Sequence, residues 1–181
     1  MKEIRIHGRG GQGSVTAAEI LAIAAFYEGK YSQAFPSFGV ERRGAPVTAF
    51  ARIGDSFIRT RCQIYEPDYV IVQDSTLIGV VDVTRGLKDD GAIIVNTEKD
   101  PEELNLNTKA RVYTVDATKI ALEILKRPIV NTVMLGAFAG ITKEFSLESL
   151  VKAVRKRLPP KIAEVNVKAV ETAYEISKEV I

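Results

Sequence analysis

Short apolar runs alternate along the chain with longer segments that have helical periodicity. The runs predict β-strands at residues 3–7, 31–35, 47–53, 57–61, 69–72, 92–95 and 112–115. The first is followed by residues 14–28, whose broad apolar face predicts a helix that ends at Gly29. The run 69–72 is apolar throughout, which is typical of a central strand covered on both faces.

The later part of the chain is dominated by helical spacing. It predicts helices at residues 118–126, 131–139 and 147–158, and a last one from 162 to 180 beyond Pro159-Pro160. Strands followed by helices predict an α/β fold, with three α/β/α layers around an open, mostly parallel, Rossmann-like sheet. The Gly54-Asp55 turn predicts a hairpin of strands 47–53 and 57–61, which would make the sheet mixed. With 181 residues, the chain is expected to form one domain, residues 1–181.

A glycine-rich loop joins the first predicted strand to the first predicted helix. It satisfies the pattern G-x-G-x-x-G, which leaves backbone N–H groups and a helix N-terminus open to an anion. The candidate ligand-binding residues are Gly8, Gly10, Gly11, Gln12, Gly13 and Ser14. Two interpretations without a ligand remain open at this point: a tight turn, or a backbone surface that presses against another subunit.

Two familiar nucleotide sites do not match this loop in detail. A dinucleotide site requires an acidic residue at the end of the second strand, where Phe35-Pro36-Ser37 stands instead. A Walker loop requires Lys and then Ser or Thr after its last glycine, and this chain has Ser14-Val15 there. NAD and ATP are therefore disfavoured.

The segment Glu41-Arg42-Arg43-Gly44 carries the most suggestive charges. Arg42 and Arg43 lie in a predicted loop bounded by prolines and glycines, where paired guanidinium groups can bind phosphate. Salt bridges across a subunit contact and plain solvation are the alternatives. Three arginines of the predicted hairpin would extend the same basic surface: Arg52, Arg59 and Arg61.

Further polar residues are expected at the carboxyl ends of the strands, where ligands bind in open α/β sheets. These are Ser37, Asp74-Ser75-Thr76, Asn96-Thr97 and Asp116 with Thr118. For Asp74, Asn96 and Asp116, helix capping is the favoured interpretation and ligand contact the alternative. His7 is predicted to be a strand-end histidine satisfied by backbone, and Cys62 to be a small buried residue.

Composition excludes several classes of function. One cysteine and one histidine exclude an internal disulfide, an iron–sulfur cluster held by this chain alone, and a His-rich metal site. A net charge of +2 gives no reason to expect nucleic acid or an acidic membrane as partner. The start of the chain has no apolar signal core, so a cytoplasmic location is expected. We find no catalytic set of residues and no metal ligands.

Two segments together carry a resemblance to a known family. They are Ile6-His7-Gly8-Arg9-Gly10-Gly11-Gln12-Gly13-Ser14 and Phe35-Pro36-Ser37-Phe38-Gly39-Val40-Glu41-Arg42-Arg43-Gly44-Ala45-Pro46-Val47. At this spacing they resemble the gamma subunits of pyruvate:ferredoxin oxidoreductases and their 2-oxoisovalerate relatives. Asn131-Thr132-Val133-Met134-Leu135-Gly136 is similar to a helix of that family, and the resemblance spans nearly the whole chain.

The resemblance implies a subunit that is inactive alone. Such complexes decarboxylate a 2-oxoacid on thiamine diphosphate, release an acyl-coenzyme A and pass electrons through iron–sulfur clusters to ferredoxin. Thiamine diphosphate, Mg and the clusters are expected on the alpha, beta and delta subunits. The gamma subunit is expected to contact coenzyme A, which Gly10, Gly11, Gln12, Gly13, Arg42 and Arg43 would do here. The rival hypothesis is a stand-alone regulatory module that binds a phosphate or nucleotide ligand.

Overall fold

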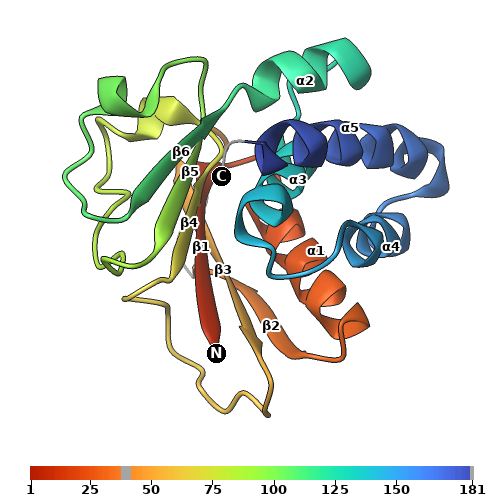
Figure 1. Cartoon of the computed structure of the whole chain (residues 1–181), viewed down its shortest axis with the longest axis horizontal. Coiled ribbons are helices and arrows are strands. Elements are labelled where there is room, and N and C mark those ends of the chain that lie inside the picture. Colours follow the sequence, from red (N-terminus) through yellow and green to blue (C-terminus); the bar gives the residue numbers. More distant parts are fainter. Residues whose placement is uncertain (38–41, 180–181) are drawn as a thin grey trace.

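A six-stranded sheet forms the centre of the computed structural model, which describes residues 1–37 and 42–179. The strand order is β2-β3-β1-β4-β5-β6 (Figure 1). The strands are β1 (Lys2–Arg9), β2 (Tyr31–Pro36), β3 (Pro46–Gly54), β4 (Tyr69–Val72), β5 (Ala92–Asn96) and β6 (Arg111–Val115). Of these described strands, β3 alone runs opposite to the others, since it pairs antiparallel with both β1 and β2.

Five helices gather on one side of this sheet, as Figure 1 shows. They are α1 (Ser14–Tyr27), α2 (Ala117–Ile124), α3 (Asn131–Thr142), α4 (Leu147–Arg157) and α5 (Pro160–Lys178). The predicted α/β fold with a mixed, mostly parallel sheet is therefore confirmed. Over the described residues, no helix is both long and apolar enough to cross a membrane.

The main core lies between the helices and the sheet. Alternate residues of each strand point to this side because the side-chain period of a strand is two. They include Ile4 and Ile6 of β1 and Ile71 of β4, all with no exposed surface. These side chains pack with the apolar faces of α1 and α3, and Phe138 of α3 stacks edge-on against Tyr69.

The other face of the sheet is covered by connecting segments. The intervening strand residues, such as Val70, Val72 and Ile93, form a second apolar cluster there with Leu77 and Val83. The covering segments contain the short 3-10 helices Ser75–Leu77 and Pro101–Leu104. Within the described ranges this layer contains no α-helix, so connecting segments with 3-10 helices stand where the predicted three-layer arrangement had a second layer of α-helices.

The predicted hairpin of strands 47–53 and 57–61 is wrong. β3 is flanked by β1 on one side and β2 on the other, so neither of its edges is free for a third strand. Residues 57–61 are irregular and pass over the second face of the sheet, where Gln33 Nε2 donates to Ile58 O at 3.1 Å. The sheet is mixed because β3 itself is reversed.

Candidate functional site

The glycine loop forms the predicted junction between β1 and α1. Gly11 and Gly13 have φ angles of 96° and 77°, in the left-handed region that favours glycine. Gly13 caps α1, and the first intrahelical bond runs from Ala17 N to Gly13 O at 2.9 Å. The N–H groups of residues 14–16 precede that bond and have no hydrogen-bond partner among the described residues. The N-terminus of α1 therefore presents backbone donors.

The second predicted segment lies directly against this loop. Gly10 N donates to Ala45 O at 2.8 Å, and Gly44 N donates to Gly10 O at 3.0 Å. A Cβ at Gly10 would lie 2.3 Å from Arg42 O, so the two loops approach each other too closely for any side chain there. The structure thus brings Arg42 and Arg43, both exposed, to the glycine loop. Phe38, Gly39, Val40 and Glu41 of the same segment lie outside the described residues.

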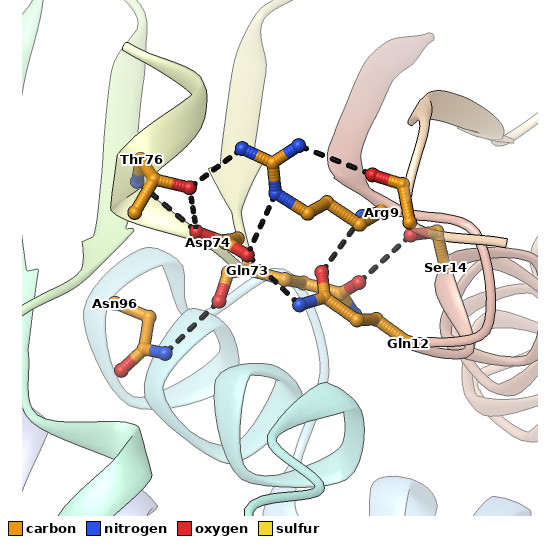
Figure 2. A network of polar contacts seen from close by, with 8 residues as sticks. Arg9, Gln12, Ser14, Gln73, Asp74, Thr76 and Asn96 are labelled. Carbon is orange, nitrogen blue, oxygen red and sulfur yellow. Dashed lines mark hydrogen bonds and ion pairs between the residues drawn. The ribbon is translucent and has the colours of Figure 1, made fainter.

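Arg9 joins both loops to the end of β4 (Figure 2). Its Nε donates to Asp74 Oδ2 at 3.2 Å, its Nη1 to Gly44 O at 3.1 Å and its Nη2 to Thr76 Oγ1 at 2.7 Å. Gln12 Nε2 also donates to Asp74 Oδ2, at 3.0 Å. Sequence reasoning gave Arg9 no role, although a cation inside a glycine loop beside a strand-end aspartate was a signal for this ion pair.

Two predicted ligand-binding side chains are engaged within the chain. Ser14 Oγ donates to Gln73 Oε1 at 2.8 Å, and Gln12 Oε1 accepts from Arg9 N at 2.7 Å (Figure 2). Gly8 makes room for this contact, since a Cβ there would lie 2.3 Å from Ser14 Oγ. The groups that remain for a ligand are the N–H groups of residues 14–16 and the side chains of Arg42 and Arg43, since Arg9 N, Gly10 N and Gln12 N already donate within the chain.

Asp74 and Asp116 cap the segments that follow their strands, as predicted. Asp74 Oδ1 accepts from Thr76 N at 3.0 Å, and Asp116 Oδ1 accepts from Lys119 N at 2.8 Å. Burial acts to raise the pKa of Asp74, but hydrogen bonds from Thr76 and Gln12 and the Arg9 charge outweigh burial and lower it. This carboxylate therefore stays ionised and holds Arg9 in place.

Asn96 has a related structural role at the end of β5. Its Oδ1 accepts from Thr118 N at 3.1 Å, so it holds the start of α2, and its Nδ2 donates to Gln73 O at 2.9 Å. A hydrogen bond to the helix start fits the capping interpretation better than ligand contact.

A cavity of about 590 Å³ opens at the carboxyl ends of the parallel strands, at the place predicted for a ligand. Asp74, Glu98, Asp116 and Glu123 line it, against one lysine, Lys119. Four carboxylates and one cation disfavour a phosphate inside this cavity. A phosphate is better accommodated outside it, beside the N-terminus of α1 and the two arginines.

Ser37 does not line this cavity. It lines a separate cavity of about 580 Å³ on the face of the sheet that connecting segments cover. His7 lines that second cavity too, and its Nε2 accepts from Arg5 Nε at 3.0 Å, so a side chain rather than the predicted backbone satisfies it. Burial, and then the Arg5 charge, lower the pKa of His7 to about 3. The imidazole is therefore neutral, with its proton on Nδ1.

Two further expectations need correction. Arg52 is fully buried and does not extend a basic surface: its Nε donates to Glu3 Oε1 at 2.7 Å and its Nη2 to Cys62 O at 2.8 Å. A cation in this position is held because a carboxylate and carbonyl oxygens satisfy it. Cys62 itself is exposed, not buried. Arg59 and Arg61 are exposed as expected.

The family of this chain follows from its similarity to known proteins. A family model described as pyruvate ferredoxin/flavodoxin oxidoreductase matches residues 3–176. The chain belongs to this family. Pyruvate synthase subunit PorC of Methanosarcina barkeri is 70% identical over 155 residues, which cover 86% of this chain and 85% of that protein.

Two other members of the pyruvate ferredoxin/flavodoxin oxidoreductase family cover nearly the whole chain. The pyruvate/ketoisovalerate oxidoreductases common subunit gamma of Thermococcus kodakarensis is 59% identical over 177 residues, with 96% of each chain covered. The crystal structure of pyruvate oxidoreductase subunit PORC from Thermotoga maritima has a TM-score of 0.85 and 43% identity. The match covers 96% of this chain and 95% of the Thermotoga maritima chain. The resemblance to a gamma subunit of this family is confirmed.

Proposed function

We propose that this chain is the gamma subunit of a multi-subunit pyruvate:ferredoxin oxidoreductase, in which it supports formation of an acyl-coenzyme A. The observation that supports this most strongly is the 70% identity to a pyruvate synthase subunit over most of both chains. Its partners would be the alpha, beta and delta subunits, and ferredoxin would accept the electrons of the complex. We also propose a cytoplasmic location and a single domain over residues 1–181.

The chemistry of the reaction is assigned to the other subunits. A single cysteine cannot hold an iron–sulfur cluster, which needs several ligands. In the part of the chain that the structure describes, no group of three or more His, Cys, Asp or Glu side chains could hold a metal ion. As the family resemblance implies, thiamine diphosphate, Mg and the clusters would belong to partner chains, and this chain would contribute binding groups.

The glycine loop and the two arginines are proposed to contact the phosphates of coenzyme A. The two loops are held together by the hydrogen bond from Gly10 N to Ala45 O, so the exposed Arg42 and Arg43 lie beside Gly10 and Gly11, in the loop that leads into α1. Guanidinium groups and free helix N–H groups are both well suited to phosphate oxygens. The acid-lined cavity next to them would repel the same phosphates, so it fits an uncharged part of the ligand.

Replacing both arginines tests this contact in the assembled complex. We expect Arg42→Ala with Arg43→Ala to raise the KM for coenzyme A about tenfold or more, since hydrogen bonds to charged groups contribute roughly 1.5–3 kcal/mol each. The KM for pyruvate should stay unchanged in an assay of viologen reduction. The matched control is Arg111→Ala with Arg127→Ala, which removes two exposed arginines outside the proposed contact. An unchanged coenzyme A KM, with complete complexes, would contradict the proposal.

The family membership favours a subunit over the stand-alone binding module and over an NAD-dependent enzyme. A mass measurement of the chain purified gently from its native cell distinguishes these hypotheses. We expect stoichiometric larger partners, and the isolated chain should not reduce viologen. A free monomer or homodimer as the sole species would support the stand-alone module.

A further inference from the structure

A cluster of exposed aromatic side chains surrounds β2, at one edge of the sheet. Phe26 is 70% exposed, Tyr27 42%, Tyr31 49% and Phe57 65%. Tyr31 and Phe57 stack edge-to-face with ring centroids 6.2 Å apart, and Phe26 stacks in the same way on Tyr27. We call these four side chains, together with the outer backbone edge of β2, the β2 edge surface.

β2 has an open backbone edge in the described part of the chain. It is the terminal strand of the sheet, beside α1 in Figure 1, and pairs with β3 on one side. Ser37 N donates to Thr48 O at 2.8 Å, and the register places these two residues opposite each other. Hydrogen-bonded and non-hydrogen-bonded pairs alternate in an antiparallel ladder. The backbone groups of Ser32 and Ala34 therefore point away from β3.

Pro36 occupies the next outward position of this edge. It has no N–H to present there, and proline at such a position limits how far an added strand can pair. The open part of the edge is thus short and is bounded at its C-terminal end. Such an edge accepts a few residues of an extended segment and does not favour an unlimited stack of strands.

Two apolar pits lie along the same edge, each of about 360 Å³. Both are bordered by Phe26 and Ser32, and one reaches between α1 and α4 to Lys156 while the other reaches Lys30. The two lysines are the charged residues that line these pits, and no acidic residue lines them. Lys30 Nζ donates to Glu144 O at 2.8 Å, so Lys156 is the lysine that is available to an acidic partner. An occupant would therefore place apolar side chains in the pits and acidic ones at their margins.

We propose that the β2 edge surface binds an extended, apolar segment with flanking acidic residues from another subunit of the oxidoreductase. The open backbone edge selects an extended chain, the pits select apolar side chains, and Lys156 selects acidic neighbours. A second copy of this chain is disfavoured because it would bring its own lysines to the same contact. The proposal rests on the subunit role above and is independent of the coenzyme A contact.

Assembly of the complex tests the aromatic part of the surface. We expect Phe26→Ser with Phe57→Ser to fold normally, because both side chains are largely exposed, and to weaken association with the other subunits at least tenfold. The measurement is the amount of this chain that co-purifies with a tagged partner subunit. Val80→Ser with Ile162→Ser is the matched control, since it removes exposed apolar side chains elsewhere. Equal assembly of both double variants, or equal loss, overturns the proposal.

Two further experiments test the lysine charge and the backbone pairing of β2 separately. Lys156→Glu should weaken assembly several-fold, whereas Lys168→Glu on the exposed face of α5 should not. Amide hydrogen exchange within residues 31–36 should become slower in the complex than in the isolated chain. Unchanged exchange there overturns the strand contact. Self-association of the isolated chain that the aromatic variant abolishes, with assembly intact, would instead identify a second copy as the occupant.

Discussion

At the scale of single residues, Gly10 determines how closely the two loops of the candidate site approach each other. We expect Gly10→Ala to lower the free energy of unfolding by about 1–3 kcal/mol, because its Cβ would overlap the Arg42 carbonyl oxygen. Chemical denaturation measures this. Gly79→Ala is the control, since a Cβ there meets no atom within 4 Å. Equal stability of the two variants would contradict the close contact.

His7 gives a residue-scale prediction about pH. Its pKa falls from 6.5 to about 3 on folding, so the unfolded chain binds more protons than the native one between these values. Stability should therefore be lost as the pH falls from 6.5 towards 3, by on the order of a few kcal/mol. His7 is the single histidine, so its NMR titration is unambiguous and should show a neutral ring at pH 5.

The control for this effect is His7→Gln, whose amide oxygen can still accept from Arg5 Nε. This variant should lose less stability than the natural chain over the same pH interval. If both chains lost stability equally, other groups would account for the acid sensitivity.

At the scale of elements, the contact between α3 and α5 depends on two glycines of α3. A Cβ at Gly136 would lie 2.3 Å from Val170 O, and one at Gly140 would lie 2.7 Å from Tyr174 O. We expect Gly136→Ala to lower Tm, because separating two packed helices costs more than the roughly 1 kcal/mol gained in helix propensity. Each kcal/mol corresponds to about 2–4 °C in calorimetry. A rise in Tm would contradict this expectation, because it would show that α5 moves away from α3 without loss of stability.

The elements also show which sequence patterns were reliable. β1, the glycine loop and α1 were predicted because strand alternation, glycine and helical spacing are local properties of residues 3–28. The strand predicted at 57–61 was wrong because the occupancy of both edges of β3 is a property of the whole sheet. Cys62 lies in the irregular segment that follows, which explains why it is exposed where burial was expected.

At the scale of the whole molecule, the two faces of the sheet should differ in local stability. α1 and α3 pack against one face, with α5 covering α3 from outside, whereas connecting segments with short 3-10 helices cover the other face. We expect amide hydrogens of residues 75–91 and 98–109 to exchange faster than those of β4, β5 and α3. Hydrogen exchange with mass spectrometry measures this. Uniformly slow exchange would contradict the difference between the layers.

The sequence by itself determined the α/β class, the junction of β1 with α1 and the inability of this chain to hold an iron–sulfur cluster alone. These conclusions follow from local hydrophobic periodicity, from the positions of the loop glycines and from the number of cysteines. None of these depends on contacts between distant residues. Arg42 and Arg43 were also candidates from their residue types alone. Their position beside the glycine loop could not be deduced from residue type.

Only the tertiary structure decided which groups meet. It placed Arg9 between Asp74 and Gly44, buried Arg52 against Glu3, and turned the Ser14 hydroxyl towards Gln73. Each of these contacts joins residues far apart in sequence, and ion pairs and hydrogen bonds form with whichever partner the fold brings within about 3 Å. The residue type determines which interactions a side chain can make. Strand order and the approach of separate loops determine which partner it meets.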